Sequence, residues 1–286
     1  MSLSTHPSRQ SILHPGPPTI SRYAYVAGHA RQRALALRQQ DFLADSIKRD
    51  MIENGADTAI VLLDGIFLSS ARYMIPGKPK DAQHAAWYSE TFSASDIRIE
   101  HGTAIVGRKN GEWFLHCHAL WHDEKTKQTY AGHLLTDQSI LGEAQSIEIM
   151  GYEGGAFEAT FDPETNFTLF QLMKGEPQAQ VNAAIITVRP HEDLRETIDK
   201  ITTELNIQSG RLFGIGSIIG AEFHDAPHMQ SYLSEILLLP GARIENGRCT
   251  ALPLACVDDK LAIYRGDLKA GGGPVLVTAE LLLIET

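Results

Sequence analysis

Residues 88–102 read YSETFSASDIRIEHG, residues 233–247 read LSEILLLPGARIENG, and the two stretches align without a gap. In each, a Ser-Glu pair is followed twelve residues after the glutamate by a glycine. A second match comes later, since YAGHL at 130–134 corresponds to YRGDL at 264–268, and residues 144–149 run parallel to residues 279–284. Self-similarity over this length indicates an internal duplication.

Each copy is expected to open with one amphipathic helix and to continue as strands. Apolar residues recur at helical spacing over residues 43–51, before Asn54-Gly55, and over residues 194–205, after Pro190. Strand-like stretches cover residues 58–63, 66–73, 113–121, 129–134, 146–150, 166–173 and 212–219. The fold class predicted from this pattern is α+β, with two related domains, each a mainly antiparallel β-sheet with a flanking helix.

The length of 286 residues fits two cores of ordinary size. We expect an extended basic N-terminal arm over residues 1–33, a domain over 34–175, a polar linker over 176–182 and a second domain over 183–286. The arm is basic because residues 1–40 hold five arginines and no acidic residue.

Composition narrows the classes of function. The net charge of -10 disfavours nucleic acid as a partner, since affinity for nucleic acid depends mostly on cations. No apolar run is long enough for a membrane span, and the first residues show no signal-peptide pattern. Three cysteines without a CxxC pair argue against a disulfide framework, so we expect a cytoplasmic protein.

Three histidines form the strongest candidate site. Residues two apart on a strand point to the same face, so His116 and His118 project together. If the next strand returns as a hairpin, it brings His133 beside them. Three imidazoles with an open fourth position are typical of a catalytic metal site, which predicts a divalent transition metal, with zinc favoured and iron, nickel or manganese as alternatives.

The second copy lacks this triad. Its corresponding positions are Ala251, Pro253 and Asp267. Against a metal site stands the general abundance of histidine in the first half, where paired strand histidines could be surface residues. The loss of all three positions in one copy favours the metal interpretation.

Candidate catalytic residues are weaker. Glu90 or Glu143 could carry a proton, and Arg98 or Arg72 could bind a substrate carboxylate. A structural or surface ion pair is the alternative for each of them. Residues that occur in both copies, Glu90 and Arg98 among them, are expected to serve the fold, and residues of one copy to serve chemistry.

The residues LHCHAL (115–120), AGHLL (131–135) and FDPETNF (161–167) resemble the signature of the plant-and-prokaryote-conserved (PPC) domain. The resemblance covers nearly all of residues 34–175 and, more faintly, the second half. It implies an antiparallel sheet with a flanking helix, a tendency to form homo-oligomers, trimers above all, and histidines at a cleft suited to a metal. Plant members carry an AT-hook for DNA binding, and no Arg-Gly-Arg-Pro hook occurs in this chain.

The same fold group includes acetolactate decarboxylase, built from two related halves with one zinc site, and a zinc ester hydrolase. By this resemblance we expect a metal-dependent lyase or hydrolase that acts on a small oxygenated, anionic substrate. The alternative is a non-enzymatic PPC-type module that binds DNA or a ligand. The triad of this chain lies in the first half, whereas that of the decarboxylase lies late in its chain.

Overall fold

The computed structural model describes residues 12–286, and antiparallel β-structure dominates it. The two α-helices of this part of the chain, α1 (Leu43–Asn54) and α2 (Leu194–Leu205), form where the sequence predicts them and have 12 residues each. Strands take up 55% of the residues and helices 10%. The predicted α+β class is therefore wrong: the chain is a mainly antiparallel β protein, because short helices accompany long strands such as the 18-residue β6 (Phe92–Lys109).

The strands of the first half form one sheet in the order β1–β10–β2–β6–β7–β8. Their bounds are β1 (Tyr23–Leu37), β2 (Thr58–Leu62), β7 (Glu112–Asp123), β8 (Thr129–Leu134) and β10 (Gln145–Glu153). β3 (Phe67–Met74) pairs with β6, β8 and the short β9 (Ile140–Leu141), so that β3, β6, β7 and β8 close a ring. β11 (Gly155–Asp162) and β12 (Phe167–Lys174) form a hairpin beside β6, β4 (Pro76–Gly77) pairs with β5 (Trp87–Tyr88), and η2 (Thr136–Gln138) is a 3-10 turn.

The second half repeats the same order of pairing, β13–β20–β14–β15–β18–β19. Its strands are β13 (Ala183–Val188), β14 (Ser209–Ile218), β15 (Ser234–Leu238), β16 (Arg243–Glu245), β17 (Arg248–Ala251), β18 (Pro253–Asp258), β19 (Ile263–Asp267) and β20 (Val275–Glu285). Each of the six strands in the first order thus has a counterpart at the same place in the second. Among the described residues, β3, β9, β11 and β12 of the first half have no such counterpart.

The alignment of residues 88–102 with 233–247 does not pair residues that occupy equivalent positions in the two sheets. Asn246-Gly247 forms the turn between β16 and β17, with both residues at positive φ, as a two-residue hairpin turn requires. Gly102, its sequence counterpart, lies within β6, and the equivalent turn of the first half is Asn110-Gly111, again at positive φ. Consequently Glu235 lies inside β15, whereas Glu90 precedes β6.

β1 joins the two sheets. Residues 29–37 of β1 pair with β10 of the first sheet, and residues 23–28 pair with β13 of the second. The predicted basic arm therefore ends earlier than expected, since residues 23–33 belong to this strand and are held by its backbone pairing. Residues 1–11 of that arm lie outside the described residues.

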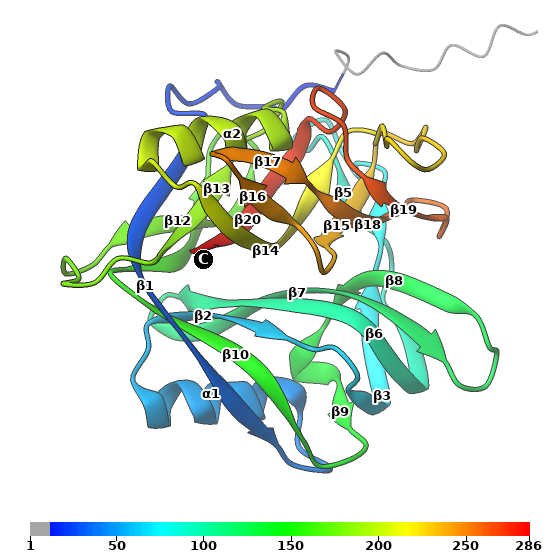
Figure 1. Cartoon of the computed structure of the whole chain (residues 1–286). Coiled ribbons are helices and arrows are strands. Elements are labelled where there is room, and N and C mark those ends of the chain that lie inside the picture. Colours follow the sequence, from blue (N-terminus) through cyan, green and yellow to red (C-terminus); the bar gives the residue numbers. More distant parts are fainter. Residues whose placement is uncertain (1–11) are drawn as a thin grey trace, which may run out of the picture.

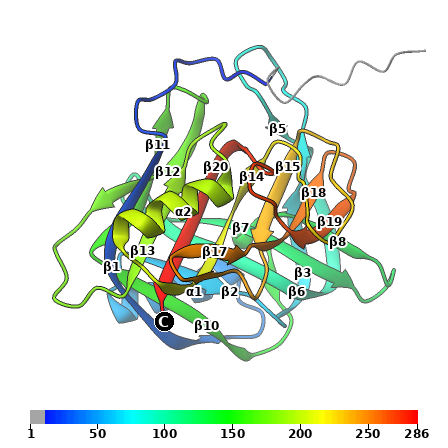
Figure 2. The same ribbon diagram turned by 45° about the horizontal axis from the view of Figure 1, so that its top comes forward.

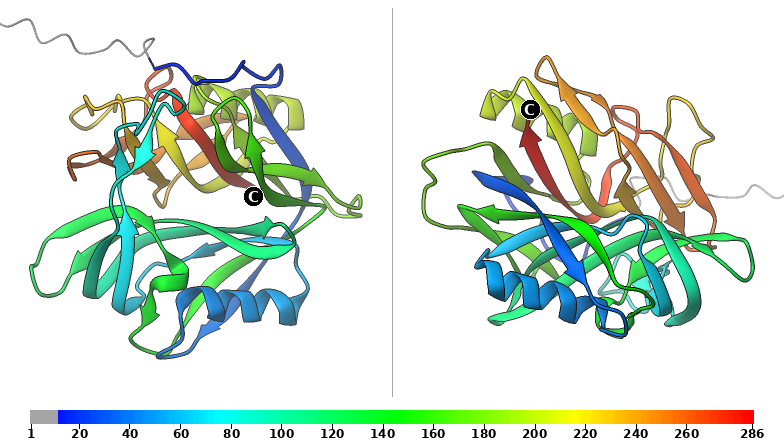
Figure 3. Two further views of the ribbon diagram at one scale, coloured as in Figure 1. Left: turned by 180° about the vertical axis from the view of Figure 1, so that it is seen from behind. Right: turned by 60° about the horizontal axis from the view of Figure 1, so that its bottom comes forward.

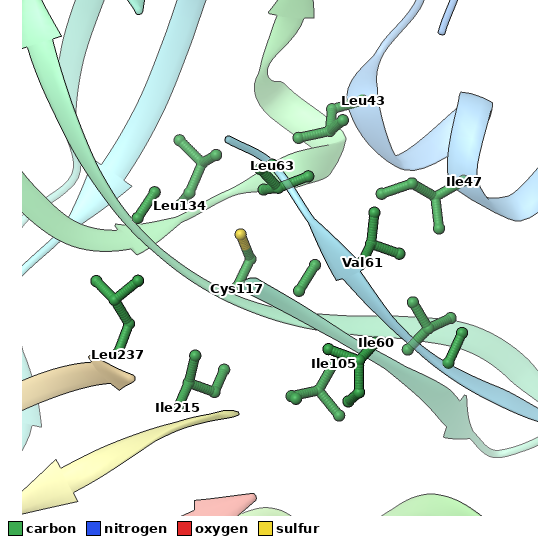
Figure 4. Packing of buried hydrophobic residues seen from close by; sticks show 14 of the residues in the cluster. Leu43, Ile47, Ile60, Val61, Leu63, Ile105, Cys117, Leu134, Ile215 and Leu237 are labelled. Atoms are coloured by element: carbon green, nitrogen blue, oxygen red, sulfur yellow. The ribbon is translucent and has the colours of Figure 1, made fainter. Parts of the chain in front are cut away.

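The two sheets stack against each other, with α1 on the outer face of the first and α2 on the outer face of the second (Figures 1 and 2). The views from behind and from below show the same layers (Figure 3). One apolar cluster runs from Leu43 and Ile47 of α1 through Ile105 of the first sheet to Ile215 and Leu237 of the second (Figure 4). Burial of each such side chain contributes about 1.5–3 kcal/mol, so the contact between the sheets is part of the core.

Neither helix of the described chain is long and apolar enough to cross a membrane.

Candidate metal centre

Three histidine side chains of the first sheet meet on the face that looks toward the second sheet. His118 on β7 lies directly opposite His133 on β8, and His116 lies two residues before His118 on the same face. One ring nitrogen from each of the three residues lies within 4.8 Å of the others. The hairpin expected from the sequence thus brings the three imidazoles together.

Groups of the second sheet hold two of these rings from behind. His118 Nδ1 donates to the carbonyl oxygen of Ile236 at 2.8 Å, and His116 Nδ1 lies 3.1 Å from Oε2 of the buried Glu280. A carbonyl oxygen and a carboxylate both accept, so both Nδ1 atoms carry the proton. The two Nε2 atoms then lie 3.1 Å apart, and in a neutral ring with its proton on Nδ1 the Nε2 atom carries the lone pair.

Such a convergence of lone pairs suits a cation. His133 Nδ1 is also buried and has no hydrogen-bond partner among the described residues. Burial lowers the pKa of His118 well below its ordinary value, with a smaller contribution from the neighbouring histidines, and it lowers the pKa of His133 to about 3. The imidazoles of His118 and His133 are therefore neutral, which is the form in which histidine binds a metal. A donor set of three imidazoles fits a divalent transition metal.

A carboxyl group of the second sheet completes the surroundings. Oε1 of Glu235, on β15, lies 3.6 Å from His118 Nε2 and 3.8 Å from His133 Nδ1. Its Oε2 atom is buried and makes no hydrogen bond to any described residue. Burial raises the pKa of Glu235 to about 8, because the charged form loses its hydration.

The histidines and Glu235 open into a cavity of about 230 Å³ between the two sheets. Its lining consists of Pro76, Ala86, Trp87, Tyr88, Phe114, His116, His118, His133, Phe167, Thr168, Leu169, Gly216, Ser217, Ser234, Glu235, Leu276, Val277 and Thr278. Glu235 is the one acidic residue of this lining, and no arginine or lysine of the described chain belongs to it. The cavity is a place where a small molecule could reach the histidines.

The other predicted site residues lie elsewhere. Glu90 is exposed, and Arg98 forms a surface ion pair with Glu143 at 3.0 Å. Arg72 donates to Ser93 Oγ at 3.1 Å on the surface. None of these four residues lines the cavity, so the structure does not bring the predicted proton carriers and carboxylate clamps to the histidines.

Sequence reasoning missed Glu235 and Glu280. The alignment of residues 88–102 with 233–247 sets Glu235 against Glu90 and so predicts a structural role for it, but the topology shows that these two residues are not equivalent. The sequence does contain a signal for Glu280. The match of residues 144–149 with 279–284 aligns Glu280 with Gln145, so this carboxyl group occurs in only one of the two copies.

The equivalent hairpin of the second sheet holds an ion pair. Pro253 pairs with Asp267 as His118 pairs with His133. Asp267 accepts from the backbone of Leu252 at 2.6 Å and lies 3.3 Å from the guanidinium of Arg195 on α2. This side of the molecule therefore carries no triad.

No protein-family model matches the sequence, and no curated protein does. Similar solved structures include a metal-containing protein from Archaeoglobus fulgidus, 21% identical over 53% of this chain and 99% of its own, with a TM-score of 0.42. A plant- and prokaryote-conserved (PPC) protein from Pyrococcus horikoshii is 18% identical over 53% of this chain and 97% of its own, with a TM-score of 0.39. A candidate DNA-binding protein from Ralstonia eutropha JMP134 is 21% identical over 49% of this chain and 90% of its own, with a TM-score of 0.40. Each of these proteins is similar to about half of this chain.

Proposed function

We propose that this protein is a metal-dependent enzyme, a hydrolase or a lyase that acts on a small carbonyl compound. His116, His118 and His133 would hold a divalent transition metal, with zinc as the favoured ion. The observation that carries the proposal is the convergence of the Nε2 atoms of His116 and His118, 3.1 Å apart, whose opposite ring nitrogens are held by Glu280 and the Ile236 carbonyl. Hydrogen-bonded partners behind the ligating histidines are a regular feature of metal sites.

A divalent metal at such a site supplies Lewis acidity toward a carbonyl oxygen. The protein's own contribution is to shape the cavity and to hold a proton. Glu235 is the acidic residue of the lining, and its unpaired Oε2 can exchange a proton with a bound molecule. We therefore assign to Glu235 the proton-carrying role that the sequence suggested for Glu90 or Glu143.

Metal content is the first test of this proposal. Wild-type protein, rinsed with chelator and offered zinc, should retain close to one zinc per chain by elemental mass spectrometry. His133→Ala should lose the ion. His122→Ala is the matched control, because His122 lies on the same strand as His116 and His118 but outside the cluster, and it should keep the metal.

Turnover is the second test. Ester cleavage and decarboxylation screens with zinc-loaded protein should give activity that falls by about 10²–10⁴-fold in Glu235→Gln, the range for loss of a proton-transferring group. The variant should still bind zinc, since the three imidazoles remain. Wild-type protein that takes up no zinc would contradict the proposal.

The alternative of a DNA-binding or ligand-binding module without turnover makes a different prediction. It expects no activity in these screens from protein that is fully loaded with zinc, and a gel shift that persists at physiological salt.

A further inference from the structure

Aromatic side chains form one wall of the cavity next to the histidine cluster. Trp87 and Tyr88 come from β5, Phe114 from β7 and Phe167 from β12. The Tyr88 ring lies 5.2 Å from the ring of His133, and the rings of Trp87 and Phe167 lie 5.5 Å apart. A flat apolar group of a bound molecule would contact these rings while its polar end faces the imidazoles.

The described lining contains no partner for a negatively charged group of a bound molecule. Recognition of a carboxylate ordinarily uses arginine or lysine, and the lining contains neither. The ammonium of Lys80 lies 4.8 Å from the centroid of the Trp87 ring but does not line the cavity. A divalent ion on the imidazoles would lie beside the carboxyl group of Glu235, and the Glu280 carboxylate behind His116 would offset part of its charge.

The volume of the cavity limits the size of the molecule that can bind there. A dry apolar cavity of roughly 150 Å³ holds benzene. The cavity here measures about 230 Å³, which adds room for a carbonyl group and a short substituent beside one ring.

We infer that the cavity takes an uncharged carbonyl compound with one aromatic or similarly flat apolar group, such as a neutral ester or amide, and discriminates against anionic analogues. The choice of a carbonyl compound rests on the proposed function. The preference for an uncharged molecule with a flat apolar group rests only on the residues that line the cavity. It replaces the anionic substrate expected from the sequence.

The test compares two probes that differ by a single carboxylate. Acetanilide and 4-acetamidobenzoate are titrated into the full-length protein by calorimetry, once after chelator treatment and once with zinc. Acetanilide should bind more tightly to the chelator-treated protein by about tenfold or more, since the carboxylate would there lose its hydration without gaining a partner. Equal or tighter binding of 4-acetamidobenzoate, or no detectable binding of either probe up to its solubility limit, would overturn the inference.

A pair of variants at the cavity rim separates charge from shape. Thr168 lines the cavity and is exposed, so a longer side chain there does not disturb the core. Thr168→Arg should shift the preference toward the anion by roughly two- to fivefold, as expected of a rim ion pair, whereas Thr168→Gln should leave it unchanged. An unchanged preference in Thr168→Arg would argue against a charge-based selection.

The two proposals fail in different ways. If zinc does not bind or no turnover occurs, the chelator-treated protein still reports the preference of the cavity. If zinc binds and turnover occurs but anionic compounds are preferred, the metal site stands and the substrate class is wrong.

Discussion

The hydrogen bond between Glu280 and His116 offers a quantitative test of how the second sheet supports the metal centre. The Glu280 carboxylate is 1% exposed, and its Oε2 atom lies 3.1 Å from His116 Nδ1. A hydrogen bond to a charged group contributes about 1.5–3 kcal/mol. If this energy acts on His116 as a ligand, Glu280→Gln should weaken zinc binding by roughly 10–100-fold.

The variant acts through the proton on the imidazole. A glutamine has the shape of the glutamate, but its amide can donate to Nδ1, and the ring then carries its proton on Nε2, the atom that faces the cluster. The free energy of unfolding of the metal-free protein should stay the same or rise, because a buried charge has been removed. Loss of zinc affinity without loss of stability is therefore the expected result.

Competition with a chromophoric zinc chelator measures the affinity, and thermal unfolding of chelator-treated protein measures the stability. Glu285→Gln is the matched control, since Glu285 lies on the same strand β20 but is exposed. Unchanged zinc affinity in Glu280→Gln, or an equal loss in Glu285→Gln, would refute the reasoning.

Three further outcomes concern the fold. Burial alone would raise the pKa of Asp162, but its hydrogen bonds and the Arg189 guanidinium, 2.5 Å away, lower it on balance. The stabilisation by this pair is therefore present above the unfolded pKa of about 4 and is lost as the pH falls through the folded pKa. The free energy of unfolding, measured by denaturant titration from neutral to acid pH, should therefore fall less steeply in Asp162→Asn than in the wild type. Gly132→Ala should destabilise by about 1–3 kcal/mol in the same measurement, because a Cβ there would lie 2.5 Å from the Met74 carbonyl oxygen, whereas Gly151→Ala, whose Cβ would meet nothing closer than 3.4 Å, is the control. Asp193→Ala should cost about 0.5–2 kcal/mol, since the Asp193 side chain caps α2 by accepting from the backbone of Glu196, and equal stability of the variant would contradict that role.

Local patterns predicted what depends on local geometry. The spacing of apolar residues predicts both helices. Helix α1 ends where Asn54-Gly55 predicts, with Gly55 in the left-handed conformation. The meeting of the histidines follows from strand parity and one hairpin, both of which the sequence between His116 and His133 contains.

The groups behind and opposite the histidines could not be predicted in this way. Glu235 and Glu280 come from the other sheet, more than a hundred residues along the chain, and reach the cluster because the two sheets stack. Sequence periodicity carries no information on how two sheets face each other. The strand β1, predicted as part of a basic arm, could not be placed for the same reason, because its pairing partners β10 and β13 lie more than a hundred residues further along the chain.

The shared strand β1 also has a consequence for how the molecule assembles. Its partners, β10 and β13, lie at residues 145–153 and 183–188, so β1 can pair with the first sheet only after about half of the chain is made, and with the second only after about two thirds. Pairings of such long sequence separation slow folding, because loop closure costs entropy before contacts form. Since one strand serves both sheets, we expect the halves to gain and lose their structure in a single cooperative transition rather than as two independent domains.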